Sequence, residues 1–185
     1  MAHKVCPWWL GYFLMNPLRR FGQDPAKILA PLVHEGMTVL EPGPGMGFFT
    51  LELARRVGRL GRVVAVDIQQ KMLNRLTRRA VKAGLLDRLD VRLASPNSMG
   101  LADLASRVDF ILAFAVVHES PDAAQFFAQL AAASRPGAGL LMAEPTGHVK
   151  PADFQRELEI ALAAGFILRD KPVIRRSQTA LLEKA

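Results

Sequence analysis

Apolar and polar positions follow one another along this chain in blocks that predict strands and helices in turn. Seven short runs are either almost wholly apolar or alternate in polarity, and each predicts a strand. They lie at residues 37–40, 63–66, 89–93, 108–116, 140–143, 166–168 and 179–182. The run at 108–116 is almost continuously apolar, which is typical of a strand buried on both faces of a sheet.

Apolar residues spaced three and four apart predict helices between these runs. The predicted helices lie at residues 24–35, from 49 onward, 71–83, 122–133 and 151–164. Asp24 before Pro25 predicts a capped N-terminus for the first helix. Gly84 follows the end of the helix predicted at 71–83, and Arg135–Gly137 ends the helix predicted at 122–133. Alternating strands and helices predict a parallel sheet covered by helices on both faces. The last two strands have no helix between them, so they predict a hairpin that leaves one strand antiparallel.

The loop after the first strand is the first candidate site. Glu41 ends the strand, and Gly43, Gly45 and Gly47 precede the helix that starts near Phe49. Glycines let a ligand lie against bare backbone, and the start of the helix offers unpaired N–H groups. The pattern predicts a loop that holds the polar part of a nucleotide-like ligand, although a tight turn would need the same glycines.

Asp67 supports the ligand interpretation. It ends the second strand, twenty residues after Gly47, where an acid can accept hydrogen bonds from both ribose hydroxyls. Nicotinamide dinucleotides and S-adenosylmethionine both use this layout. The dinucleotide fingerprint requires a small residue where this chain has Phe48 or Thr50, whereas Glu41 suits a ligand that carries an ammonium group. S-adenosylmethionine is therefore the favoured cofactor.

Four segments together resemble class I S-adenosylmethionine-dependent methyltransferases. They are Val39–Thr50, Val64–Gln69, Val108–Glu119 and Ser134–Pro145. Among subgroups, the chain is most similar to small-molecule enzymes of the ubiquinone/menaquinone C-methyltransferase type. The resemblance implies a Rossmann-like α/β fold with seven strands in the order 3-2-1-4-5-7-6. It also implies methyl transfer from S-adenosyl-L-methionine, with S-adenosyl-L-homocysteine as product.

The resemblance also implies which residues contact the cofactor. They are Glu41, Gly43, Gly45, Gly47, Asp67, Ile68, Met72, Asn97, Ser98, Ala113 and Phe114. The chain departs from the family at residues 95–98, where an acid usually meets the adenine amino group. Asn97, Ser98 or a backbone group would serve there instead. Asp67 could also cap a helix, and Ile68 and Met72 could belong to the core.

His118 and Glu119 are the catalytic candidates, because they follow the fourth strand, where the family places residues that face the acceptor. Methyl transfer needs alignment of donor and acceptor and, for some acceptors, a base, so no nucleophile motif is expected. No metal site is predicted. An alternative in which His118, Glu144 and His148 join Cys6 and His3 around a soft metal or a thiophilic acceptor is less favoured. In the simpler interpretation His118 orients the acceptor or acts as base, Glu144 caps a loop and Cys6 packs beside Trp8.

Composition limits the partners. The 185 residues fit a single domain at 23–185 after an N-terminal segment at 1–22. The net charge is +7, but the basic residues form scattered pairs, which favours solvated helix faces over a nucleic-acid groove. The single cysteine excludes an intrachain disulfide and fits a cytoplasmic protein.

The N-terminal segment is rich in aromatic residues. Val5–Met15 contains Trp8, Trp9, Tyr12 and Phe13, and it is too short to span a bilayer, which requires about 20 residues. Three interpretations of this segment are open. It covers a bound substrate as a lid, it forms a contact in a homodimer, or it binds to a membrane surface.

Four functional hypotheses follow from the sequence, in decreasing order of support. A methyltransferase that acts on a small-molecule acceptor is favoured. An RNA or protein methyltransferase is the first alternative, and the basic net charge supports it. Enzymes that methylate an exocyclic amino group carry an Asn/Asp-Pro-Pro-Tyr/Phe signature after the fourth strand. This chain lacks that signature, which argues only against an adenine amino group as acceptor. A protein that binds S-adenosylmethionine without catalysis is the third hypothesis, and a nicotinamide oxidoreductase is a distant fourth.

Overall fold

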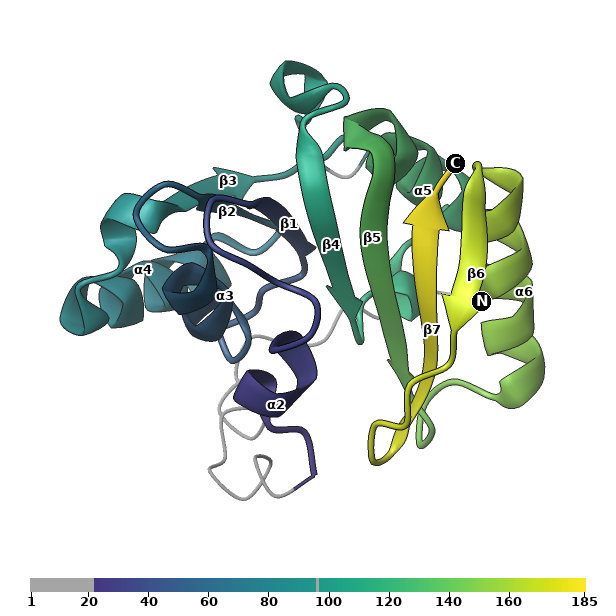
Figure 1. Ribbon diagram of the computed structural model, residues 1–185. Helices are drawn as coiled ribbons and strands as arrows, with labels where there is room; N and C mark the ends of the chain where they lie inside the picture. Colours follow the sequence, from purple (N-terminus) through teal and green to yellow (C-terminus); the bar gives the residue numbers. More distant parts are fainter. Residues whose placement is uncertain (1–21, 96) are drawn as a thin grey trace. The chain divides into compact units, whose positions relative to one another are not determined.

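The computed structural model describes residues 22–95 and 97–185 (Figure 1). These residues fall into two compact units, a first that ends at Gly100 and a second that spans Leu101–Ala185. Residues 1–21, which include the N-terminal aromatic segment, lie outside the described residues. The structure therefore does not test whether this segment is a substrate lid, a homodimer contact or a membrane-binding segment.

The first unit alternates helices and strands. Its elements are α2 (Pro25–Leu29), β1 (Thr38–Pro42), α3 (Thr50–Val57), β2 (Arg62–Asp67), α4 (Gln70–Ala83) and β3 (Leu89–Leu93). β2 pairs in parallel with β1 on one side and with β3 on the other. The apolar run Val63–Val66 is fully enclosed between these neighbours, as a central parallel strand requires.

Two helix ends of this unit show how the sequence sets local structure. Gly84 adopts the left-handed conformation that ends α4, with φ of 65°, and its N–H donates to the Val81 carbonyl, as predicted. The first helix is shorter than predicted, because α2 ends at Leu29 instead of near residue 35. Pro31 has no N–H to donate back to the helix, so the regular hydrogen-bond ladder is interrupted there. The N–H groups of Leu32 and Val33 both donate to the Leu29 carbonyl and form a turn in place of a further helical stretch.

The second unit contains the remaining strands. Its elements are β4 (Val108–Phe114), α5 (Ala123–Ala133), β5 (Ser134–Pro145), α6 (Pro151–Ala163), β6 (Phe166–Asp170) and β7 (Ser177–Lys184), with short 3-10 turns η4 (Ala102–Leu104) and η5 (Val117–Glu119). β4 and β5 are parallel, and β7 runs antiparallel to both β5 and β6. The predicted hairpin and single antiparallel strand are therefore present (Figure 1).

Two strand ends in this unit differ from the prediction. β4 stops at Phe114, two residues early, because Ala115 turns the chain with a positive φ of 56°. β5 begins at Ser134, directly after α5, so the predicted loop at Arg135–Gly137 lies inside a strand. The register jumps there from Val108–Ser134 to Phe110–Gly139, which shows that the Pro-Gly turn forms a bulge instead of a separate loop.

The seven strands follow the order β3-β2-β1-β4-β5-β7-β6, which confirms the predicted Rossmann-like arrangement. Buried aliphatic residues form the core of each unit, with Val63, Val64 and Leu76 in the first and Ile111, Leu130 and Leu141 in the second. Among residues 22–95 and 97–185, no helix is both long enough and apolar enough to cross a membrane.

Candidate functional site

The glycine loop of the first unit is fastened to the sheet at its first residue. The N–H of Gly43 donates to the Val66 carbonyl of β2 at 2.9 Å, so the loop leaves β1 against the end of its neighbour. Gly43, Gly45 and Gly47 have φ values of 67°, 54° and 83°. All three lie in the left-handed region, which disfavours residues with a Cβ atom.

The glycines at 45 and 47 differ in what surrounds them. A Cβ added to Gly45 would meet no atom within 4 Å, so this part of the loop faces open space. A Cβ added to Gly47 would lie 2.5 Å from Leu76 Cδ1, so close packing of α4 against the loop explains this glycine. Gly45 therefore offers bare backbone to a ligand, whereas Gly47 has a structural reason to be glycine.

Glu41 is buried beside this loop without a full set of partners. Only 4% of the residue is exposed, and Oε2 has no hydrogen-bond partner among the described residues. Burial, with a smaller contribution from the nearby Asp67 carboxylate, raises the pKa of Glu41 to about 8. The buried Thr50 hydroxyl lies near enough to oppose that rise, although its Oγ1 completes no hydrogen bond with the described residues.

Asp67, at the end of β2, is 9% exposed and lies beside the same loop. Its Oδ1 accepts a hydrogen bond of 2.8 Å from the N–H of Gln69, the residue that precedes α4. Burial raises the pKa of Asp67, and the backbone N–H groups of Gln69, Gly45 and Ile68 partly oppose the rise. The carboxylate therefore contributes to the start of α4, as the helix-cap interpretation expected, and also contacts the glycine loop.

The structure places the other cofactor candidates in varied surroundings. Ile68 is half exposed next to Asp67, while Met72 is buried on the inner face of α4 with Leu73. Asn97 and Ser98 are exposed in the loop after β3, and Ser98 Oγ accepts a hydrogen bond from the N–H of Gly100. Two further candidates lie in the second unit at the end of β4, where Ala113 is fully buried and Phe114 is half-buried.

The first unit has the chemistry that S-adenosylmethionine requires. A buried acid with an unsatisfied oxygen, Glu41, needs a donor from a ligand, and a cationic ligand would hold it in its charged form. Gly45, in the loop that follows that acid, leaves open space for the ligand's polar end. Asp67 supplies a second carboxylate for hydroxyl donors. These three residues therefore fit the cofactor that the sequence favours.

The second unit contains a histidine fixed by a buried carboxylate. Ala115 has a positive φ of 56°, an uncommon conformation for a residue with a Cβ atom, and its N–H donates to the Ala143 carbonyl at 2.7 Å. This turn directs the next two N–H groups, those of Val116 and Val117, to Glu144 Oε1 at 3.1 and 2.9 Å. The other oxygen, Oε2, forms a short hydrogen bond with Nδ1 of His118.

The charges around His118 raise its pKa. Burial alone would lower the pKa of His118, but the hydrogen bond and charge of Glu144 outweigh it, and Glu119 and Glu157 add to the rise. The Glu144 side chain is fully buried, while 26% of the His118 side chain is exposed. The imidazole thus has one edge held by the protein and part of its surface open to a reactant.

Two neighbours complete this cluster. His148, which precedes α6, lies parallel to His118, with ring centroids 6.5 Å apart and planes 10° apart. Glu157 on α6 has a pKa raised to about 7 by burial and by the charge of Glu144, and its buried Oε2 has no partner among the described residues. A carboxyl group whose pKa is near neutral therefore lies close to Glu144 and His118.

The metal hypothesis gains no support from these side chains. Within the part of the chain that the structure describes, no group of three or more His, Cys, Asp or Glu side chains could hold a metal ion. Cys6 and His3, which that hypothesis also required, lie outside the described residues. Glu144 does cap the turn after β4, as the simpler interpretation expected, and it binds His118 as well.

Sequence reasoning missed three contributors to these sites. Thr50 lies in the first turn of α3 beside Glu41, and Arg79 of α4 donates a hydrogen bond to the Met46 carbonyl in the glycine loop. Glu157 lies on α6, whose apolar spacing had suggested only packing. No local signal distinguishes any of the three from ordinary helix residues, because their neighbours come from distant parts of the chain.

Comparison with known proteins agrees with this geometry. A family model described as a methyltransferase domain matches residues 33–170. A 37.1 kDa protein of transposon TN4556 from Streptomyces fradiae is 30% identical over 138 residues, which are 75% of this chain and 38% of that protein. The chain therefore spans well under half the length of this relative.

Solved structures give the same fold. A SAM-dependent methyltransferase from Aquifex aeolicus matches with a TM-score of 0.84 and 27% identity, over 97% of this chain and 98% of its own. A SAM-dependent O-methyltransferase from Thermotoga maritima matches with a TM-score of 0.65 and 18% identity, over 88% and 64% of the two chains. At that lower identity, the likeness concerns the fold alone.

Proposed function

This chain belongs to the class I S-adenosylmethionine-dependent methyltransferases, and from that premise we propose that it transfers a methyl group from S-adenosylmethionine to a small-molecule acceptor. The observation that carries the proposal is the buried Glu41 carboxylate, whose Oε2 has no hydrogen-bond partner among the described residues, together with the open backbone of Gly45 in the loop that follows Glu41. A ligand with hydrogen-bond donors and positive charge would satisfy that oxygen.

The cofactor residues have distinct roles in this proposal. Glu41 binds a donor on the amino-acid part of the cofactor, Gly45 leaves space for that part, and Asp67 accepts hydrogen bonds from the ribose hydroxyls. Ile68, Asn97 and the remaining predicted contacts would surround the adenosine. Bound S-adenosylmethionine supplies an electrophilic methyl group on a sulfonium, so the protein mainly aligns the acceptor and excludes water.

The acceptor residues belong to the second unit. His118 is the proposed base, and Glu119, the next residue in η5, adds negative charge beside it. A base held within reach of the acceptor contributes typically 10²–10⁴-fold to the rate of a step that needs proton removal. Glu119 is proposed to orient the acceptor and to favour the charged imidazolium that forms when a proton arrives.

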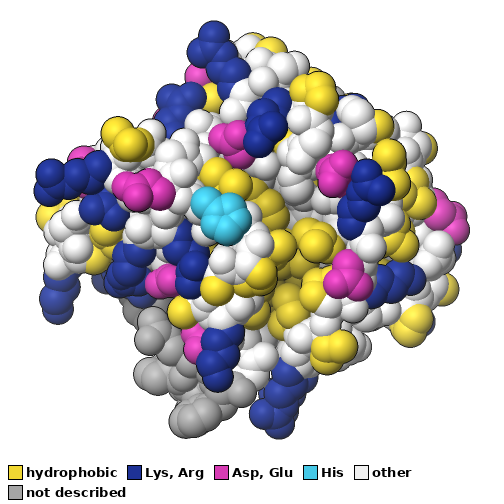
Figure 2. Space-filling model, in the orientation of Figure 1, with side chains coloured by type: hydrophobic (Ala, Val, Ile, Leu, Met, Phe, Trp, Pro, Cys, Tyr) yellow, Lys and Arg dark blue, Asp and Glu magenta, His cyan; other side chains and the backbone are white. Residues whose placement is uncertain are grey.

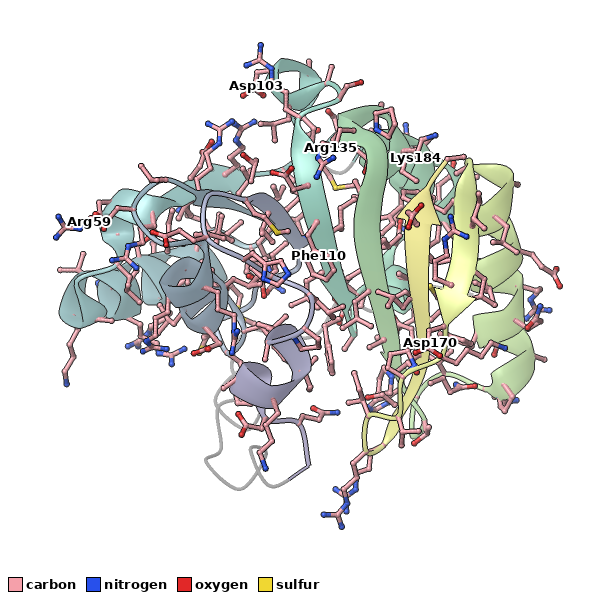
Figure 3. All side chains as sticks on the ribbon, in the orientation of Figure 1. Arg59, Asp103, Phe110, Arg135, Asp170 and Lys184 are labelled. Atoms are coloured by element: carbon pink, nitrogen blue, oxygen red, sulfur yellow. The ribbon has the colours of Figure 1, made fainter. Side chains whose placement is uncertain are left out.

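Six of the seventeen arginines form ion pairs among the described residues, which supports a small-molecule acceptor over RNA. Arg55 and Arg56 pair with Glu52, Arg92 pairs with Asp90, Arg135 with Asp109, Arg156 with Asp153 and Arg169 with Glu183. Figure 2 shows Lys and Arg side chains interspersed with Asp and Glu on the face drawn. Arg135, labelled in Figure 3, leaves the β5 bulge toward the neighbouring strand β4, where Asp109 neutralises it. RNA binding would use unpaired cations to contact phosphates.

The first experiment tests the cofactor. S-adenosylmethionine and S-adenosylhomocysteine are expected to raise the melting temperature of the protein, since each binds the folded state alone. NAD and NADP are expected to leave it unchanged. If calorimetry instead gave tighter binding of NADH than of S-adenosylmethionine, the proposed cofactor site would be wrong.

The second experiment tests the acceptor. The protein is incubated with S-adenosylmethionine labelled in its methyl group, together with either a small-molecule extract or total RNA, and the products are separated by size. Label in the small-molecule fraction is expected. The resemblance to ubiquinone and menaquinone C-methyltransferases makes an electron-rich ring carbon one acceptor to include. Label that enters RNA alone, with salt-dependent affinity, would favour the RNA alternative. Cofactor binding without any labelled product would favour the non-catalytic one.

A further inference from the structure

We propose that Glu144 is a positioning residue that holds His118 with its proton on Nδ1, so that Nε2 takes a proton from the methyl acceptor. The inference rests on the proposed function, because it specifies how the acceptor side of that reaction works. It follows from the hydrogen bond between Glu144 Oε2 and His118 Nδ1 and from the surroundings that hold the carboxylate in place.

Glu144 is immobile in a way that suits this role. The residue is fully buried at the end of β5. Its Oε1 accepts two backbone N–H groups, from Val116 and Val117, and its Oε2 faces the imidazole. An ionised carboxylate accepts hydrogen bonds and donates none, so the ring nitrogen opposite it must be the one that carries hydrogen.

The backbone around His118 is shaped for this contact. β4 ends at Phe114, and the left-handed turn at Ala115 points the following N–H groups toward Glu144. The 3-10 turn η5 then places His118 within reach of the same carboxylate. One side chain therefore fixes both the turn and the imidazole, and a displaced Glu144 would disturb both.

Titratable groups from each neighbouring segment lie near the His118 ring. Glu144 lies on β5, Glu119 on η5 itself, Glu157 on α6, and His148 in the turn before α6. The carboxylates stabilise the imidazolium and raise the pKa of His118, while burial opposes them. The ring is therefore an efficient proton acceptor once the pH is high enough for it to start neutral.

This arrangement specifies the class of acceptor. An acceptor X–H gives its proton to His118 Nε2 as its X–H bond breaks. The electron pair left on X forms the bond to the methyl carbon, while the carbon–sulfur bond of the cofactor breaks and its electron pair returns to sulfur. Hydroxyl, thiol and acidic C–H groups meet this requirement. An acceptor without a removable proton, such as a thioether, would make no use of the base.

The decisive experiment observes the His118 ring directly by two-bond ¹H–¹⁵N NMR of the full chain across a pH series. The neutral wild-type ring is expected to carry its hydrogen on Nδ1. In Glu144→Gln, the amide oxygen can keep both backbone hydrogen bonds, while the amide NH₂ donates to Nδ1 and moves the hydrogen to Nε2. The pKa of His118 should then fall. Glu183→Gln, the same change in an exposed ion pair on β7, is the matched control and should alter neither property.

Turnover gives a second readout. With an acceptor identified by its labelled product, kcat of Glu144→Gln should fall by roughly 10²–10⁴, the usual contribution of a general base, because the histidine would hold the wrong tautomer. The affinity for S-adenosylmethionine should stay unchanged, and the acid limb of the pH profile should move to lower pH. A product made from an acceptor without a removable proton would contradict the proposed acceptor class.

The two proposals fail in different ways. A wild-type ring with its hydrogen on Nε2, or a variant whose tautomer and pKa match the wild type, would overturn the role of Glu144 whether or not the protein is active. If the variant did not fold, the wild-type spectrum would still decide the tautomer. The expected tautomer in a protein that methylates nothing would instead overturn the proposed function.

Discussion

Glu41→Gln should weaken binding of S-adenosylmethionine by an amount that depends on pH. With a pKa of about 8, the Glu41 carboxyl of the free protein is roughly nine-tenths protonated at pH 7. Binding through the carboxylate then costs about 1.4 kcal/mol at pH 7, because the proton must leave first. At pH 9 the cost disappears. The contribution of Glu41 to the cofactor affinity of the wild-type protein should therefore rise about tenfold between these two pH values.

The glutamine side chain has almost the same shape but cannot become charged. A hydrogen bond to a charged group contributes about 1.5–3 kcal/mol, so Glu41→Gln should lose roughly 10- to 150-fold in affinity at pH 9. At pH 7 the difference should shrink by about tenfold, since the wild-type protein there must first lose its proton. Between pH 7 and pH 9, the affinity of the variant should show little of the wild-type pH dependence.

Isothermal titration calorimetry measures both effects. Titrations at pH 7 in buffers with different ionisation enthalpies should show close to one proton released per cofactor bound by the wild-type protein, and almost none by Glu41→Gln. Glu35→Gln, an exposed change in the same unit, is the control and should keep the wild-type value. Wild-type affinity in Glu41→Gln at pH 9, or an unchanged proton release, would refute the assignment of Glu41 to the cofactor.

The same pKa has a consequence for the stability of the free protein. The pKa of Glu41 is higher in the folded state than its ordinary value of 4.5, so the folded state binds the proton more tightly than the unfolded state. This contribution to stability is complete below pH 4.5 and is lost as the pH rises through about 8, by up to about 1.4 kcal/mol per pH unit. Glu41→Gln should therefore unfold at a higher temperature than the wild type at pH 9 when no cofactor is present.

Three further predictions concern other parts of the chain. Asp67→Ala should weaken cofactor binding by about 1–3 kcal/mol in calorimetry, and Asp67→Asn, which keeps an acceptor for the Gln69 N–H, separates this loss from damage to α4. Gly45→Val should abolish cofactor binding while the protein stays folded by circular dichroism, because its side chain would enter the open space beside the loop; unchanged affinity would move the site elsewhere. Deleting residues 1–21 should leave a folded core that binds cofactor but remove turnover or dimer formation; normal activity and normal mass would count against both the lid and the dimer contact.

The strands were predictable because each buried strand shows its burial in its own sequence. The apolar runs at 63–66 and 108–116 agree with β2 and β4 to within two residues. The predicted strand boundaries were wrong where the local conformation depends on residues far away in the sequence. Nothing local shows that Arg135–Gly137 forms a bulge, because a bulge is defined by the register of β5 against β4.

The candidate site was predictable to the same extent. Glu41 and Asp67 directly follow apolar runs, so their place at the ends of neighbouring strands could be predicted without a structure. The sequence predicts that His118 and Glu144 lie at the ends of neighbouring strands. The hydrogen bond between them depends on the turn at Ala115, for which the sequence contains no local signal. Glu157 was missed because a single glutamate on an amphipathic helix is normally solvated.

Two glutamates show why local sequence cannot decide such roles. Glu41 and Glu144 both end an apolar strand and both precede a proline, and both are buried. Glu144 receives two backbone N–H groups and an imidazole because the neighbouring chain turns toward it at Ala115. Glu41 leaves Oε2 without a partner among the described residues, and burial raises its pKa to about 8. The same Glu-Pro dipeptide thus holds a turn and a histidine in the second unit, whereas in the first unit its carboxyl group keeps an unsatisfied acceptor. An unsatisfied buried acceptor is the group that a bound ligand can stabilise most.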